Sequence, residues 1–133
     1  MALKKSSKQL VEEARAKVRT IPTAEAVALH GRPDVVFVDI RDVRELERDG
    51  MIPGALHAPR GMLEFWVDPD SPYYKDVFGS GKEFVFYCAS AWRSSLATVA
   101  VQEMGLAPVA HVDGGFNAWK QAGGPVAEKP QKK

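Results

Sequence analysis

The chain has 133 residues, 45% of them hydrophobic and 26% charged, which indicates one soluble globular domain with a single core. Its 18 basic and 17 acidic side chains leave a net charge of +1, so charge gives no basis for a nucleic-acid partner or a membrane partner. The single cysteine excludes an internal disulfide, and no apolar run is long enough for a signal peptide or a membrane span. We therefore expect a cytoplasmic protein.

The N-terminal residues are predicted to form a helix that packs on the outside of the domain. Ser7 can cap this helix, and four apolar side chains share one of its faces: Leu10, Val11, Ala14 and Val18. We expect an N-terminal helical extension over residues 1–20, a main domain over residues 21–126 and a flexible C-terminal tail over residues 127–133.

Three apolar runs rich in β-branched and aromatic residues predict buried strands, and they cover residues 34–40, 83–88 and 107–112. Helical patterns separate and follow these runs, over residues 24–30, 41–50, 61–66, 93–104 and 115–123. This alternation predicts an α/β fold with a mostly parallel central sheet and helices on both faces. Ligands of such sheets bind at the carboxyl ends of the strands, which makes the segment from Asp39 and the loop from Cys88 the candidate site.

The loop CASAWRS, residues 88–94, lies between a predicted strand and the first turn of a predicted helix. The N–H groups of this loop and of the first helical turn have no partner within the strand or the helix, so a curled loop would direct them at one anion. The small residues Ala89, Ser90 and Ala91 suit such a curl. Cys88 would then lie at the bottom of a positive cup.

Residues 84–102 contain no carboxylate and a single charged side chain, Arg93. A free thiol has a pKa of about 8.5, and a decrease of about two units would make the thiolate the main form at neutral pH. Amide donors, the helix terminus and Arg93 would favour the thiolate, whereas a carboxylate would oppose it. Because a cation at a helix N-terminus costs roughly 0.3–1 kcal/mol, we expect an anionic partner for Arg93: Glu45, Asp39, a substrate anion or the thiolate itself.

An isolated cysteine can also be a small apolar residue of the core, but its place at a strand end, the absent acids and Arg93 favour a reactive thiol. The three histidines, at positions 30, 57 and 111, show no metal-ligand spacing, and no second feature marks one as a partner of the cysteine. We therefore predict no metal and no cofactor, and we interpret each histidine as structural or solvated.

The sequence leaves two interpretations open for Trp92 and for Arg60, and it gives Phe116 and Trp119 a structural role only. Trp92 either forms an apolar wall over the site or packs against a neighbouring element. Arg60 either lies near the mouth of the site or is a surface charge. Phe116 and Trp119, at helical spacing, are predicted to belong to the core.

Four motifs in this sequence resemble, in the same order, those of the rhodanese-like sulfurtransferases, over roughly residues 20–126. The family's Asp-x-Arg with a Glu shortly after is similar to Asp39, Arg41 and Glu45. The other three are the turn MIPGALHAPRG at 51–61, the loop CASAWRS at 88–94 and the ending DGGFNAW at 113–119.

Two positions depart from the family's pattern. Met51 stands where the family usually has His, so no catalytic role is carried over to that turn. The residue after the cysteine is Ala89, which leaves the loop with one cation and weakens the case for thiosulfate itself as the natural donor.

The resemblance implies a rhodanese-like fold and a sulfurtransferase in which Cys88 is the nucleophile. The thiolate would take the outer sulfur of a small anionic donor such as thiosulfate, hold it as a persulfide and pass it to cyanide or a thiol, including a thiol of a protein acceptor. The substrate-binding residues implied by the resemblance are Arg93, Ala89, Ser90, Ala91, Trp92 and Ser94. The supporting residues at the neighbouring strand end are Asp39, Arg41 and Glu45.

Two other functions remain open for the same residues. A sulfur-carrier or partner-binding module would use the fold for recognition, with little turnover of its own. A cysteine phosphatase or arsenate reductase would also need a thiolate in a cup of amides followed by an arginine. Those enzymes typically have five residues between the two, whereas four separate Cys88 from Arg93, so the loop should be too tight for a tetrahedral phosphate.

Overall fold

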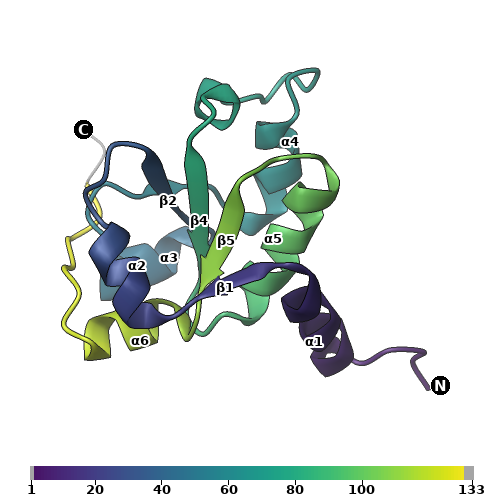
Figure 1. Cartoon of the computed structure of the whole chain (residues 1–133), viewed down its shortest axis with the longest axis horizontal. Helices are drawn as coiled ribbons and strands as arrows, with labels where there is room; N and C mark the ends of the chain where they lie inside the picture. The colour runs from purple at the N-terminus through teal and green to yellow at the C-terminus, as the bar shows by residue number, and fades with distance from the viewer. Residues whose placement is uncertain (1, 131–133) are drawn as a thin grey trace.

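The computed structural model describes residues 2–130 and shows a five-stranded sheet, ordered β1-β5-β4-β2-β3, in which neighbouring strands pair in parallel (Figure 1). The strands are β1 (Arg19–Ile21), β2 (Val35–Asp39), β3 (Leu56–His57), β4 (Glu83–Tyr87) and β5 (Val109–Val112). The α-helices are α1 (Ser7–Lys17), α2 (Thr23–Leu29), α3 (Val43–Asp49), α4 (Leu63–Val67), α5 (Trp92–Glu103) and α6 (Gly115–Gln121), and the 3-10 helices are η1 (Arg60–Met62) and η2 (Asp76–Gly79). The predicted α/β fold class is confirmed.

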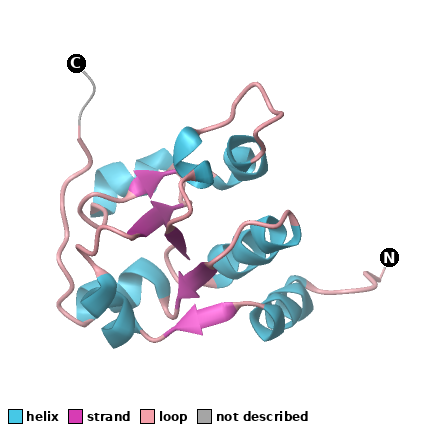
Figure 2. Cartoon of the chain, turned by 45° about the horizontal axis from the view of Figure 1, so that its top comes forward, coloured by secondary structure: helices cyan, strands magenta, loops and turns pink. Residues whose placement is uncertain are grey.

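Helices cover both faces of the sheet, and each face has its own apolar core (Figure 2). On one face, Phe86 of β4 packs in a cluster with side chains of α4 and α5, and on the other face Tyr87 packs with side chains of α2 and α6. Successive side chains of a strand point to opposite faces, so a strand between two helical layers is apolar on both. Phe116 and Trp119 of α6 are fully buried, which confirms them as core residues.

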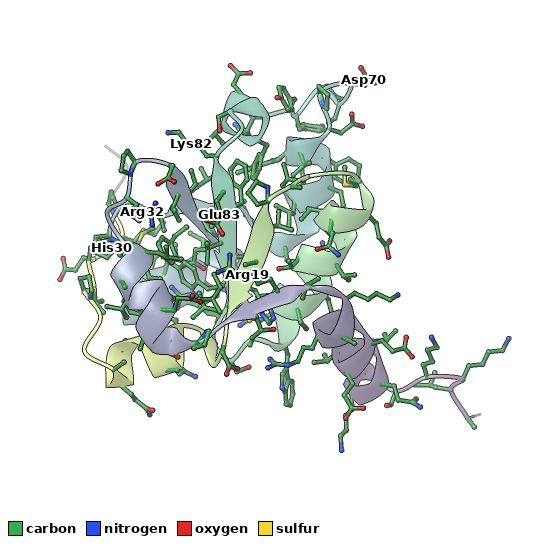
Figure 3. The ribbon with its side chains drawn as sticks, viewed as in Figure 1. Arg19, His30, Arg32, Asp70, Lys82 and Glu83 are labelled. Carbon is green, nitrogen blue, oxygen red and sulfur yellow. The ribbon has the colours of Figure 1, made fainter. Side chains whose placement is uncertain are left out.

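The strand β1 was not predicted, and it extends the sheet beyond β5. Arg19 at its start donates a hydrogen bond of 3.0 Å to Glu83 at the start of β4, and both residues are labelled in Figure 3. The predicted N-terminal helix is present and packs against α5. Its cap is Ser6, however, and not Ser7: Ser6 Oγ accepts from Gln9 N at 3.1 Å, and the Gln9 side chain accepts from Ser6 N at 2.8 Å, because the Gln stands three residues after Ser6.

The C-terminal segment runs past the connection between α3 and β3. Ala127 forms an antiparallel bridge with Met51, with N–H···O distances of 2.8 Å in both directions. The segment expected to be a flexible tail, residues 127–133, therefore begins with a paired residue, and its positions 131–133 lie outside the described residues. None of the helices within residues 2–130 is long and apolar enough to cross a membrane.

Because the strands are parallel, their carboxyl ends lie along one edge of the sheet. In Figure 1, β4 and β5 point towards α6 and the start of α5. The segment after β2, the Cys88 loop after β4 and the turn between β5 and α6 consequently meet at this edge, although they lie far apart in the sequence.

Candidate active site

The Cys88 loop is a tight turn between β4 and α5. Ala91 has φ 97° and ψ −2°, and it is the only residue other than glycine with a positive φ among residues 2–130. This turn brings two backbone donors to the sulfur: Ala91 N lies 3.2 Å and Ser94 N 3.3 Å from Cys88 Sγ. Ser94 belongs to the first turn of α5, where N–H groups have no acceptor within the helix, so the sulfur is a partner for one of them.

The first two carbonyl groups of the loop, those of Cys88 and Ala89, accept hydrogen bonds from α6. Phe116 N donates to Cys88 O at 2.7 Å, and Asn117 N donates to Ala89 O at 3.1 Å. In a trans peptide the N–H points opposite to the C=O, so the N–H groups of Ala89 and Ser90, which share peptides with these two carbonyls, face away from α6. Gly115 allows this contact, because a Cβ there would lie 2.5 Å from Cys88 O and 2.7 Å from Ala89 O. The second glycine of the ending DGGFNAW is thus required by the approach of α6 to the loop.

The sulfur is enclosed in this structure. Cys88 is 0% exposed and belongs to the apolar cluster that includes Phe86 and Ala97. Two of the donors that the sequence predicts for a cup of amides, Ala91 N and Ser94 N, contact the sulfur, and Cys88 itself has no solvent-exposed surface. Ser90, in the same loop, is exposed to solvent.

Arg93 is bound to Glu45, one of the anionic partners that the sequence allowed. Its Nη1 and Nη2 atoms donate to the two carboxylate oxygens at 2.7 and 3.0 Å, which ties α5 to α3. The hydrogen bonds to Glu45 raise the pKa of Arg93, with smaller contributions from the nearby Cys88, and they lower the pKa of Glu45. Glu45 also accepts from Asp42 N at 3.1 Å in the capping box of α3, so the carboxylate that holds Arg93 is itself fixed.

Asp39 and Arg41 form a buried ion pair at the end of β2. Arg41 Nη2 lies 2.7 Å from Asp39 Oδ2, and it also donates to Gly50 O at 2.7 Å. The guanidinium carbon lies 4.4 Å from the ring centroid of Phe116 in α6. Burial is the largest influence on Arg41 and opposes its charge, but the hydrogen bonds to Asp39 and the negative charges nearby together outweigh it, so the pKa of Arg41 is raised. The pair joins β2 to Gly50 at the end of α3 and to Phe116 of α6.

Ser94 takes part in a second polar contact beneath the loop. Its Oγ lies 3.0 Å from His111 Nδ1, and His111 Nε2 lies 2.9 Å from Thr20 Oγ1. His111 is fully buried, and this burial, with a smaller effect of Arg15, lowers its pKa to about 4. The imidazole is therefore neutral at pH 7.

The family of this chain follows from comparison with known proteins. A model of the rhodanese-like domain matches residues 22–122. The chain belongs to the rhodanese-like domain family. This rhodanese-like domain is 54% identical to a Rhodopseudomonas palustris protein of unknown function, described as a possible tyrosine phosphatase; the match covers 96% of this chain and 98% of that one, with a TM-score of 0.93.

Two further similarities point to different chemistries. The rhodanese-like domain is 25% identical to a thiosulfate sulfurtransferase from Pseudomonas aeruginosa, with a TM-score of 0.69, over 84% of this chain and 19% of that chain. It is also 29% identical to the dual specificity phosphatase Cdc25 of Arabidopsis thaliana, over 84% of this chain and 82% of that protein. The similarities therefore include both a sulfurtransferase and proteins with phosphatase names.

The structure of the rhodanese-like domain also describes the side chains that the sequence left with two interpretations. Trp92 is 70% exposed, so it does not pack against a neighbouring element. Arg60 pairs with Glu64 at 2.8 Å across η1 and α4. Among the residues described here, no group of three or more His, Cys, Asp and Glu side chains could hold a metal ion. The contact between Ser94 and His111 was missed; its one sequence signal was a histidine inside the apolar strand APVAHV.

Proposed function

We propose that this rhodanese-like domain is a sulfurtransferase that carries a sulfane sulfur as a persulfide on Cys88. The observation that carries the proposal is the pair of backbone donors, Ala91 N and Ser94 N, at 3.2 and 3.3 Å from Sγ. Hydrogen bonds to an anion are stronger than hydrogen bonds to a neutral thiol, so both donors favour the thiolate. The likeness to a thiosulfate sulfurtransferase supports the same chemistry.

The reaction takes place in two displacement steps. The Cys88 thiolate attacks the outer sulfur of a thiosulfate-like anion, a new S–S bond forms, and the old bond breaks with its electron pair leaving on the sulfite group. Cyanide or a thiolate acceptor then attacks the outer sulfur of the persulfide, and the Cys88 thiolate leaves. The negative charge lies on Sγ in the thiolate and on the outer sulfur in the persulfide, and amide donors beside these sulfur atoms would stabilise it in each state.

The loop residues supply the remaining roles in this proposal. The N–H groups of Ala89, Ser90, Ala91 and Ser94 surround the bound anion. Among residues 2–130, the N–H groups of Ala89 and Ser90 have no hydrogen-bond acceptor. Arg93 draws the anionic end of the donor towards the loop, at the expense of part of its contact with Glu45.

Two other parts of the site have roles that do not involve bonding to the sulfur. Trp92, which is exposed, forms an apolar wall for the donor or acceptor. The Asp39–Arg41 pair keeps the neighbouring strand end in place.

The test is intact mass spectrometry of the protein after exposure to thiosulfate or mercaptopyruvate. We expect the mass to rise by one sulfur atom, to be restored by cyanide or a thiol, and to stay constant in the Cys88→Ser protein, because the chain has no other cysteine. Normal sulfur transfer by Cys88→Ser would end the proposal. A persulfide that resists cyanide and thiols, but is discharged by a protein acceptor, would identify a sulfur carrier.

A phosphatase is the second candidate, because two of the similar proteins have phosphatase names. The loop length opposes it: four residues separate Cys88 from Arg93, whereas such phosphatases typically have five. An aryl phosphate assay distinguishes the two functions. Phosphate release at a rate comparable to sulfur transfer, lost in Cys88→Ser, would favour the phosphatase.

A further inference from the structure

Three polar side chains link the N-terminal strand to the Cys88 loop. Thr20 of β1 and His111 of β5 are partners in the sheet register, and their side chains lie 2.9 Å apart (Figure 1 shows β1 beside β5). The other ring nitrogen of His111 lies 3.0 Å from Ser94 Oγ, and Ser94 N lies 3.3 Å from Cys88 Sγ. Thr20 precedes residues 22–122, so the outer end of this chain of contacts comes from outside the segment that the family model matches.

His111 suits this bridging position because it is neutral. A neutral imidazole has one N–H donor and one nitrogen acceptor, so two hydroxyl groups satisfy it in either tautomer. The charged groups beside it are Arg15 of α1 and Asp113 after β5, which pair with each other at 3.3 Å. The bridge therefore fixes geometry and brings no charge of its own to the loop.

Two ties hold the first turn of α5 from opposite sides. Arg93 is bound to Glu45 of α3, and the next residue, Ser94, is bound to His111 of β5. Both contacts fix the first turn of α5 and thereby the direction of the Ser94 N–H. The contact with His111 acts most directly, because the Ser94 side chain and amide belong to the same residue. If the tie to His111 is released, the first turn of α5 can rotate and the Ser94 donor moves off the sulfur.

We propose that Thr20, through His111 and Ser94, positions a backbone donor on Cys88, so that the N-terminal strand is a working part of the thiolate site. Thr20 and His111 are positioning residues, since neither touches the sulfur. This inference gains its functional meaning from the proposed sulfur transfer, but its test measures only the thiol and does not depend on sulfur transfer.

The test is the pH titration of thiolate absorbance in the full-length protein, with the Cys88→Ser protein subtracted as the blank. The chain has a single cysteine, so the difference reports Cys88 alone, without any need for a reagent to reach the buried sulfur. Thr20→Val keeps the shape of the side chain and removes its hydroxyl. We expect the thiol midpoint to rise by about 0.5–1 pH unit, because one of the two hydrogen bonds to the thiolate weakens.

Two further variants separate positioning from structural damage. Thr20→Ser retains a hydroxyl and should keep the wild-type midpoint. Thr23→Val removes the hydroxyl of another half-buried threonine, which binds Asp113 O at 3.0 Å and has no hydrogen bond to His111 or Ser94, and it should also keep the wild-type midpoint. The inference is overturned if Thr20→Val lowers the unfolding temperature without moving the midpoint, or if Thr23→Val moves it equally. If the wild-type protein forms no persulfide, the proposed sulfur transfer is refuted but the inference about Thr20 is not.

Discussion

The buried histidine predicts a specific loss of stability in mild acid. In the unfolded chain His111 titrates near 6.5, whereas in the folded protein its pKa is lowered to about 4, first by burial and then by Arg15. Above pH 6.5 both states hold a neutral imidazole. As the pH falls below 6.5, the unfolded chain binds a proton that the folded protein does not, so the free energy of unfolding decreases until about pH 4.

The gap of about 2.5 pKa units corresponds to a limit of about 3 kcal/mol, at about 1.4 kcal/mol per unit, and about 2 kcal/mol of it is already lost between pH 7 and pH 5. This is a large part of the 5–15 kcal/mol that typically stabilises a domain. Urea unfolding followed by tryptophan fluorescence at the two pH values measures the loss, since the chain has three tryptophans.

The matched comparison is the His111→Gln protein, whose amide can bond to hydroxyls but does not titrate. This protein will be less stable at pH 7, but we expect its stability to fall by about 2 kcal/mol less than that of the wild type between pH 7 and pH 5. Carboxylates titrate in both proteins, so their contribution cancels in the difference. Equal losses in the two proteins would refute the reasoning and mean that the buried ring takes up its proton without unfolding.

Three further predictions concern the residues around the loop. Asp39→Asn should lower the free energy of unfolding by about 3–5 kcal/mol in urea denaturation, because it leaves the buried Arg41 charge without its counter-ion; a loss below about 1 kcal/mol would contradict this. Arg93→Ala should slow thiocyanate formation from anionic donors by about 10-fold or more, while Arg93→Lys keeps part of the rate; an unchanged rate in Arg93→Ala would remove Arg93 from donor binding. Gly115→Ala should destabilise the fold by about 2 kcal/mol or more and impair sulfur transfer, because its Cβ would meet Cys88 O. The control is Gly123→Ala: Gly123 also has a positive φ (+81°), but a Cβ there would have nothing within 4 Å. This variant should affect stability less and leave sulfur transfer intact.

The sequence alone was sufficient for the fold class and for the place of Cys88. Both depend on local patterns: apolar runs such as that around Phe86 can be buried only between two layers of helices, and a cysteine at the end of such a run precedes a strand-to-helix turn. The need of Arg93 for an anionic partner could also be predicted from the local sequence, because the helix dipole repels any cation at the N-terminus.

The tertiary structure decided which partners these residues have. The sequence left four anions open for Arg93, and the fold selects Glu45, 48 positions away. Thr20 and His111 are 91 positions apart, and nothing local marks them as partners until β1 and β5 pair. The burial of Cys88 could not be predicted either, because it depends on side chains such as Phe86 and Ala97 that pack around it in the folded protein. The spacing of apolar residues along the sequence indicates which side of a helix or strand is buried. The partner of each buried polar group depends instead on which distant segments the connections between parallel strands bring to the same edge of the sheet.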